Sequence, residues 1–225
     1  MPMPRRSLAP LPPGPALPEI APMLLTDGRP FASDDWIAEV KYDGVRMLAQ
    51  VDAGAVTLKS RNGANATRWF PEVCRALAAV PAKGRFIVDG EVAVLDEYGR
   101  SDFDKVMVRV RAKGFPVGTA AAAFCVFDLL VEQGKDLMQL PLLERKARLA
   151  KLLGVAPGLL AMTHIEGALA QEFYKQAAAL KLEGIVLKRK NSLYVPGSRS
   201  ADWIRCKRPG ATPAQRWSRG PLEPL

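Results

Sequence analysis

The chain has 225 residues, of which 48% are hydrophobic and 24% are charged, a composition typical of a globular protein with a buried core. Its formal net charge of +9 favours a polyanionic partner, above all nucleic acid, although basic surfaces without such a partner are also common. No apolar run approaches the roughly 18 residues that a membrane helix needs, so a membrane-spanning protein is not expected.

Few side chains are available for the commonest metal and redox sites. The three cysteines, Cys74, Cys125 and Cys206, are odd in number and widely spaced, which argues against a disulfide framework or a zinc ribbon and fits a reducing cytoplasm. The single histidine, His164, excludes a site with two histidine ligands and leaves one possible base for a serine–histidine–aspartate triad.

Both ends of the chain are rich in proline. Residues 1–18 carry seven prolines, and such a segment forms neither a helix nor a central strand, so we expect a disordered tail. The prolines after Arg5 and Arg6 interrupt any apolar segment of a twin-arginine export signal, so export is not expected. Residues 209–225 are rich in Pro, Gly and Arg and are predicted to be disordered as well. The folded domain is therefore expected over residues 19–208, in a cytoplasmic, nucleoid-associated protein.

Strand and helix patterns follow one another between these tails. A half-buried strand ends at Lys41, before a turn at residues 42–44. Alternating side chains then predict a hairpin of residues 45–51 and 55–60. Further strands are predicted at 86–94, 122–131, 183–189 and 202–208, and helices at 141–153 and 168–181. Hairpins interrupted by isolated helices indicate an α+β fold with mainly antiparallel sheets, and neither GxGxxG nor GxxxxGK[ST] phosphate loop occurs.

Several charged residues stand at strand ends or inside apolar strands. Taken singly, each is more often part of a salt bridge or a solvated edge. Taken together, they are the groups that polyphosphate chemistry requires, with cations for phosphate and carboxylates for Mg²⁺ or ribose hydroxyls. They are Lys41, Arg61, Asp89, Glu91, Glu183, Arg205 and Lys207.

Six short motifs in a fixed order contain these residues. They are KYDGVR at 41–46, SRNG at 60–63, DGE at 89–91, FCVFDLL at 124–130, EGIVLK at 183–188 and WIRCKR at 203–208. This set resembles the covalent nucleotidyltransferases, which include DNA ligases, RNA ligases and mRNA capping enzymes. The flanks APMLL at 21–25 and YVPGSRSADWIRCKR at 194–208 are most similar to ATP-dependent DNA ligases, especially the ligase module of bacterial non-homologous end joining. The resemblance covers residues 20–208 and implies an ATP-grasp-like nucleotidyltransferase fold with antiparallel sheets flanked by helices.

The resemblance also implies a role for each candidate residue. Lys41 would attack the α-phosphate of ATP and form lysyl-AMP; AMP would then move to a DNA 5′-phosphate, and a 3′-hydroxyl would displace it. Only the neutral amine of a lysine is nucleophilic, and nearby cations favour that form. The expected partners of the nucleotide are Glu39 at the base, Phe127 stacked on adenine, Glu91 at the ribose or metal, Glu183 at the metal, and Arg46, Arg61, Arg205 and Lys207 as cations. Arg205 departs from the family's usual KxK motif, because arginine holds its charge on a planar fork.

The same resemblance sets the expected cofactors and partners. ATP is favoured over NAD, because the NAD-dependent members carry an upstream domain and only 40 residues, largely proline-rich, precede Lys41. Mg²⁺ or Mn²⁺ would accompany ATP, and nicked or broken double-stranded DNA would be the substrate. Only 18 residues follow Lys207, too few for the OB-fold domain of ligases, so we expect an adenylation domain alone and weak nick sealing unless a separate polypeptide supplies that domain.

Three alternatives stay open at this point. Lys41 could be a solvated flank of an ordinary turn, although the ordered motif set argues strongly against this. The chain could be an RNA ligase or a capping-type nucleotidyltransferase, since the motifs do not specify the sugar of the substrate. It could also be a non-catalytic module that binds DNA ends and has kept the fold, although such a module would have no need of the lysine.

Overall fold

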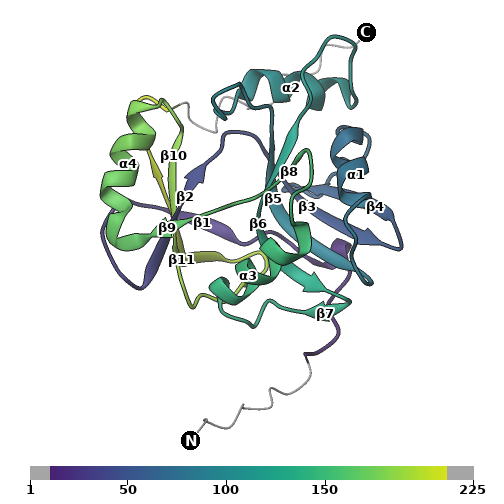
Figure 1. Ribbon diagram of the computed structural model, residues 1–225, viewed down its shortest axis with the longest axis horizontal. Coiled ribbons are helices and arrows are strands. Elements are labelled where there is room, and N and C mark those ends of the chain that lie inside the picture. Colours follow the sequence, from purple (N-terminus) through teal and green to yellow (C-terminus); the bar gives the residue numbers. More distant parts are fainter. Residues whose placement is uncertain (1–10, 212–225) are drawn as a thin grey trace, which may run out of the picture.

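Two β-sheets and four α-helices make up the computed structural model, which describes residues 11–211 (Figure 1). One sheet has the order β1-β11-β10-β2-β9, with β1 Leu24–Asp27, β11 Arg199–Lys207, β10 Gly184–Arg189, β2 Trp36–Lys41 and β9 Ile165–Glu166. The other has the order β4-β3-β5-β6-β7, with β4 Ala55–Ser60, β3 Val45–Asp52, β5 Phe86–Ala93, β6 Ala123–Glu132 and β7 Lys135–Asp136, and β8 (Leu159–Ala161) pairs with β6. We call them the β10 sheet and the β5 sheet. All strand pairs are antiparallel except β1–β11 and β6–β8, so the predicted α+β class is confirmed.

The helices cover the outer faces of the sheets. Helix α4 (Ala170–Ala179) packs on β10 and β2, where the small residues Ala170 and Ala177 are buried against Ile185 and Leu187. Helices α1 (Pro71–Ala78), α2 (Phe103–Ala112) and α3 (Leu142–Leu153) pack on the β5 sheet and contribute to one buried cluster with it. In Figure 1, α2 is at the top of the view and α3 is lower down. Two short 3₁₀ helices lie at Leu17–Glu19 and Gly167–Leu169. Within residues 11–211, no helix is long and apolar enough to span a membrane.

A shared cluster of buried side chains joins the two sheets. Ile37 and Trp203 come from the β10 sheet, and Leu48, Ile87 and Leu130 come from the β5 sheet. Each of these side chains is at most 1% exposed. The sheets are therefore packed against each other at one end, which leaves room for a cleft at the other.

The predicted strands and helices are present. In the β3–β4 hairpin, the backbone of the turn explains why its residues predict a hairpin. Ala53 and Gly54 have φ values of 46° and 81°, and positive φ at both central residues defines the type I′ turn that suits the twist of a hairpin.

The proline-rich N-terminal segment differs from the expectation for the residues that the structure describes. Residues 12–14 lie against β7 and the turn before it instead of leaving the domain: Pro12 O accepts a hydrogen bond from Asp136 N (2.8 Å), and Gly14 N donates to Gly134 O (2.8 Å). Farther along, Leu17 N donates to Gln50 Oε1 of β3 at 3.0 Å. A proline lacks an N–H but keeps its carbonyl, so it can lie at a sheet edge as an acceptor. The packed region therefore begins before residue 19. Residues 1–10 and 212–225 of the predicted tails lie outside the described part of the chain.

Candidate functional site

The register of the β10 sheet brings the predicted residues of three strands onto one face. Residues directly opposite each other in an antiparallel pair lie on the same face, and so do residues two apart along a strand. The opposed sets are Lys41–Gly184–Lys207, Glu39–Val186–Arg205 and Ile37–Lys188–Trp203. Two motif regions far apart in the sequence, 39–41 and 205–207, thus meet across β10.

The β5 sheet supplies the opposite wall through a second register. Arg46 lies opposite Glu91, and Glu91 lies opposite Cys125. Strand β6 carries a bulge at the next position, because Gly90 pairs with Val126 while Asp89 pairs with Asp128, and Phe127 is the extra residue. Phe127 lies two residues from Cys125 and lines the cleft with it, whereas the bulge places Asp128 opposite Asp89.

A cleft lies between these two walls and encloses about 490 Å³ of space not filled by protein atoms, part of it open to solvent. Five of the predicted residues line it: Glu39, Lys41, Arg46, Glu91 and Phe127. The remaining lining is mostly apolar, as expected for a pocket that accepts a planar base.

Lys41 is the last residue of β2 and lies at the edge of this cleft. Its Nζ forms an ion pair with Glu183 Oε2, and Lys207 Nζ lies 2.9 Å from Glu183 Oε1. The Lys41 side chain is 18% exposed and that of Glu183 is 6% exposed, so the pair is accessible from the lysine side. The predicted nucleophile, one predicted metal ligand and one predicted phosphate contact are therefore in direct contact.

A glycine next to Glu183 makes this contact possible. Gly184 has a φ of +148°, and a Cβ atom there would lie 2.1 Å from the carbonyl oxygen of Cys206. Only glycine lets β10 start this close to β11. Glu183 is thereby held at the strand end, between Lys41 and Lys207.

Glu39 lies deeper in the cleft and is 2% exposed. Lys146 Nζ is 2.5 Å from its Oε1, and Lys188 Nζ is 2.6 Å from its Oε2. Burial raises the pKa of Glu39, but the charges of Lys188 and Lys146 lower it by more. The pKa therefore lies below its usual value, and the group stays ionised. A nucleotide base that reaches Glu39 would have to share this carboxylate with the two lysines.

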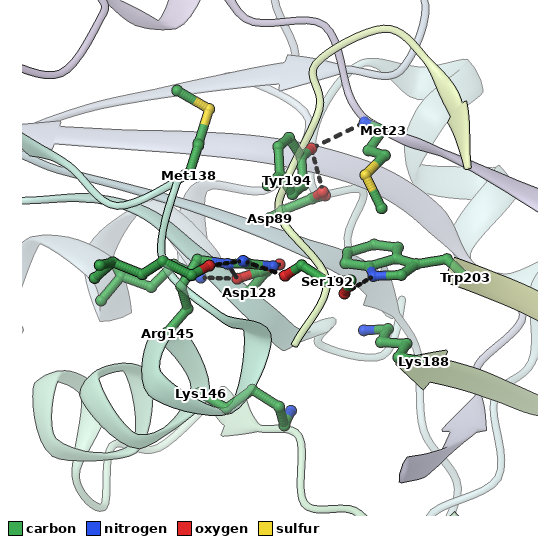
Figure 2. Close-up of polar contacts among 12 residues, drawn as sticks. Met23, Asp89, Asp128, Met138, Arg145, Lys146, Lys188, Ser192, Tyr194 and Trp203 are labelled. Atoms are coloured by element: carbon green, nitrogen blue, oxygen red, sulfur yellow. Dashed lines mark hydrogen bonds and ion pairs between the residues drawn. The ribbon is translucent and has the colours of Figure 1, made fainter. Parts of the chain in front are cut away.

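Cations already contact the Phe127 ring. Lys188 Nζ is 4.3 Å and Arg46 Cζ is 5.3 Å from the ring centroid, both within the range of cation–π contacts. Lys188 Nζ is also 4.3 Å from the Trp203 ring, beside which Figure 2 shows it. An adenine that stacks on Phe127 would therefore displace one of these cations from the ring or lie beside it.

Glu91 is the carboxylate of the cleft that has no close partner among residues 11–211: no hydrogen bond or ion pair joins its oxygens to a described residue. Burial raises its pKa to about 7; Lys41 and Arg46 partly oppose this, whereas Glu183 and Asp89 add to it. A group in this state gains most from a cation or a hydroxyl brought by a ligand.

Four predicted residues are not among those that line the cleft: Glu183 and Lys207, which form an ion pair beside Lys41, and Arg205 and Arg61. Arg205 is paired with Asp27, with Nη2 2.8 Å from Oδ2. The exposed Arg61 is tied to the site through its backbone, which donates to Arg46 O at 3.1 Å. Burial lowers the pKa of Arg61, and so do the charges of Arg46, Arg205 and Arg199, which shows that basic side chains surround it.

The carboxylates suit a divalent metal ion only in part. No group of three or more His, Cys, Asp or Glu side chains that could hold a metal ion occurs in the described part of the chain. Mg²⁺, however, is usually held by one or two carboxylates together with substrate phosphates. Glu91 and Glu183 fit that requirement, since Glu91 lacks a partner and its pKa reflects the nearby charge of Glu183.

Sequence reasoning missed three side chains of the site. Lys188 and Trp203 share a strand face with residues already singled out, two positions from Val186 and Arg205, so the two-residue period could have found them. Lys146, which lies on α3 and also donates to Met162 O at 2.8 Å, carried no such signal.

Comparison with known proteins agrees with the motifs. The model of the ATP dependent DNA ligase domain family matches residues 19–207. The multifunctional non-homologous end joining DNA repair protein LigD of Mycobacterium tuberculosis is 35% identical over 192 residues, which are 84% of this chain. A probable DNA ligase of Streptomyces coelicolor is 38% identical over 178 residues, or 75% of the chain.

Solved structures give the same result for the fold. A mycobacterial DNA ligase D complexed with ATP and MES superposes with a TM-score of 0.73 at 32% identity, covering 85% of this chain and 61% of that one. The chain spans 24% of the length of the M. tuberculosis relative and 34% of the S. coelicolor one.

Proposed function

Because the chain belongs to the ATP-dependent DNA ligase domain family, we propose that residues 19–208 form an adenylation domain that moves AMP from ATP to a DNA 5′-phosphate. One observation carries the proposal above all others. Lys41 stands at the edge of a mostly apolar cleft, in contact with a carboxylate that a second lysine also binds. An isolated surface lysine would have neither the cleft nor these neighbours.

The first step forms a covalent bond to Lys41. Lys41 first gives up one proton of its ammonium group, which Glu183 Oε2, in contact with Nζ, can receive. The neutral Nζ then attacks the α-phosphorus of ATP, the bond to pyrophosphate breaks, and a second proton passes to solvent as the P–N bond forms. Lys207, on the other oxygen of Glu183, would move to the phosphates, where its charge offsets the negative charge of the transition state.

The second and third steps release the AMP. An oxygen of the DNA 5′-phosphate attacks the phosphorus, the P–N bond breaks, and the Lys41 nitrogen regains a proton. A 3′-hydroxyl then attacks the activated DNA phosphate and AMP leaves. Nicked or broken duplex DNA is proposed as the substrate because the M. tuberculosis relative is named a non-homologous end joining DNA repair protein.

Mg²⁺ or Mn²⁺ is part of the proposal. Glu91 and Glu183 would hold the ion, which would neutralise phosphate charge when bound. The partnerless Glu91 carboxylate supports this assignment.

A further domain or a separate polypeptide is proposed to supply an OB-fold that closes over the nucleotide. A cytoplasmic location at the nucleoid follows from the proposed DNA substrate.

AMP transfer to DNA tests the proposed function. The protein is first loaded with radiolabelled AMP from ATP and freed of nucleotide, and then mixed with a nicked duplex that carries a 5′-phosphate. We expect the label to move to the DNA in a single turnover. The same duplex with a 5′-hydroxyl should take no label. Label that stays on the protein with the phosphorylated duplex would refute the DNA half of the proposal.

A further inference from the structure

Tyr194 is buried completely, yet its hydroxyl makes two hydrogen bonds that link distant parts of the chain (Figure 2). The hydroxyl donates to Asp89 Oδ2 at 2.7 Å and accepts from Met23 N at 3.0 Å. Burial raises the pKa of Tyr194 well above its usual value, with Asp89 adding to the effect, so the hydroxyl remains a donor. Tyr194 thus connects its loop directly to Asp89 on β5.

The next link runs from Asp89 to the cleft. Asp89 is 0% exposed and binds Arg46 through two parallel hydrogen bonds, Nε to Oδ1 at 3.0 Å and Nη2 to Oδ2 at 2.6 Å. Such a bidentate pair fixes the plane of the guanidinium as well as its place. No described residue accepts a hydrogen bond from Nη1 of Arg46, which lines the cleft. That nitrogen is available to a ligand.

The loop that carries Tyr194, residues 190–198, is itself held rigidly. Arg145 Nη1 donates to Ser192 O at 2.9 Å while its other nitrogens bind Asp128, both at 2.8 Å. Tyr194 N also donates to Met138 O at 2.9 Å. Figure 2 shows this buried network beside the Tyr194–Asp89 pair. A hydroxyl fixed to this degree can restrain Asp89 instead of following it.

We propose that Tyr194 and Asp89 are positioning residues, which set the Arg46 guanidinium so that its Nη1 meets an oxygen of the bound nucleotide. The inference rests on the proposed function, because it takes the nucleotide to be the ligand of the cleft. Tyr194 does not touch the nucleotide: it acts through Asp89 and Arg46. Its contribution is to the affinity for ATP, since Arg46 is already in place before the ligand enters.

The double-mutant cycle of Tyr194→Phe and Arg46→Lys tests this chain of contacts. Phenylalanine keeps the ring and removes the hydroxyl, and lysine keeps the charge and removes the fork that Asp89 aligns. We expect Tyr194→Phe to weaken ATP binding about tenfold when Arg46 is present and less than twofold when residue 46 is lysine, with a small change in the adenylation rate at saturating ATP. A purely structural role would lower the unfolding temperature and leave the two affinity ratios equal.

Tyr174→Phe is the matched control. Its hydroxyl donates to Lys207 O at 2.9 Å in a partly buried hydrogen bond, and no hydrogen bond joins it to Asp89. Its effect on ATP affinity should be the same with arginine and with lysine at residue 46. If Tyr194→Phe does not fold, Asp89→Asn replaces it in the same cycle.

Either of two results would overturn the inference: an unchanged ATP affinity in Tyr194→Phe, or an equal loss in both backgrounds. Adenylylation of Lys41 by the unmodified chain is measured separately. If that fails, the proposed function fails, whereas an adenylylated chain without coupling between the two residues rejects only the positioning role.

Discussion

Glu91 makes the stability of the fold depend on pH, because a carboxyl group that titrates near neutrality changes both stability and ligand binding. Its pKa is raised to about 7 in the folded chain from 4.5, so folding favours the protonated form. The contribution of Glu91 to stability is fully present below its pKa in the unfolded chain, and it is lost as the pH rises through its pKa in the folded chain.

Glu91→Gln should therefore change the pH dependence of unfolding. Between pH 5 and pH 8 the unmodified chain should lose up to about 3 kcal/mol relative to Glu91→Gln, whose amide does not titrate. Urea unfolding at the two pH values measures the difference. Glu97→Gln, at an exposed position, is the control and should match the unmodified chain. Parallel pH curves for the unmodified chain and Glu91→Gln would show that Glu91 titrates normally.

Lys146 is a second single residue whose effect can be tested, because it forms an ion pair with Glu39. We expect Lys146→Met to weaken ATP binding roughly tenfold and to reduce the preference for ATP over GTP, because truncating one partner of a buried charge pair leaves the other incompletely paired. Lys146→Arg should restore part of the loss. The exposed Lys151→Met, on the same helix, is the matched control. Isothermal titration with both nucleotides gives the result, and equal losses for ATP and GTP would reject a role in base selection.

At the scale of elements, the start of β10 is the most constrained backbone of the site. Gly184→Ala would place a Cβ 2.1 Å from Cys206 O, and neither backbone can move without breaking the β10–β11 pairing. We expect a loss of roughly 2–4 kcal/mol in the free energy of unfolding, since a strained φ and a backbone clash add. Gly118→Ala also has a positive φ, +80°, but nothing within 4 Å, and should cost less. Similar losses in the two variants would show that the close approach is not tight.

Strands were predicted more easily than helices, for reasons visible in particular elements. β3 and β4 flank a turn whose residues suit a hairpin, and Met47, Ala49 and Val51 recur every second residue, so both strands are predictable from the sequence. Helix α2 was not predicted, because its inward face carries Arg109, which is 0% exposed and paired with Glu72 at 2.8 Å. A buried charge in place of an apolar residue hides the helical period. α1 buries only Val73 and Leu77, too few positions to reveal a period.

The site followed a similar rule. The family resemblance carried by the ordered motifs predicts Lys41, Glu39, Arg46, Glu91 and Phe127 as site residues, and the cleft brings these five together. The pairing partners of those residues could not be predicted, because Lys146 and Tyr194 reach the site from a helix and a loop whose positions depend on tertiary packing. The β6 bulge that places Asp128 opposite Asp89 also leaves no mark in the sequence.

For the whole molecule, the net charge of +9 and the basic side chains around Arg61 predict a salt-sensitive affinity for duplex DNA. Because the phosphates dominate such contacts, we expect affinity to fall at least about tenfold between 50 and 200 mM salt. Fluorescence anisotropy with a labelled nicked duplex measures this, and a neutral-backbone oligonucleotide of the same sequence should bind without such dependence. Salt-independent binding of the duplex would argue against a phosphate-contacting surface.

The most direct test of the account is the mass of the chain after incubation with ATP and Mg²⁺. The account predicts a gain of one adenylyl group, located on Lys41 by peptide mapping, and no gain with GTP. Lys41→Arg should gain nothing, because a guanidinium stays protonated at working pH, and it should remain folded, because residue 41 is at a strand end and 18% exposed. An unmodified chain that gains no mass, or an adduct that persists in Lys41→Arg, would contradict the assignment of Lys41 as the nucleophile.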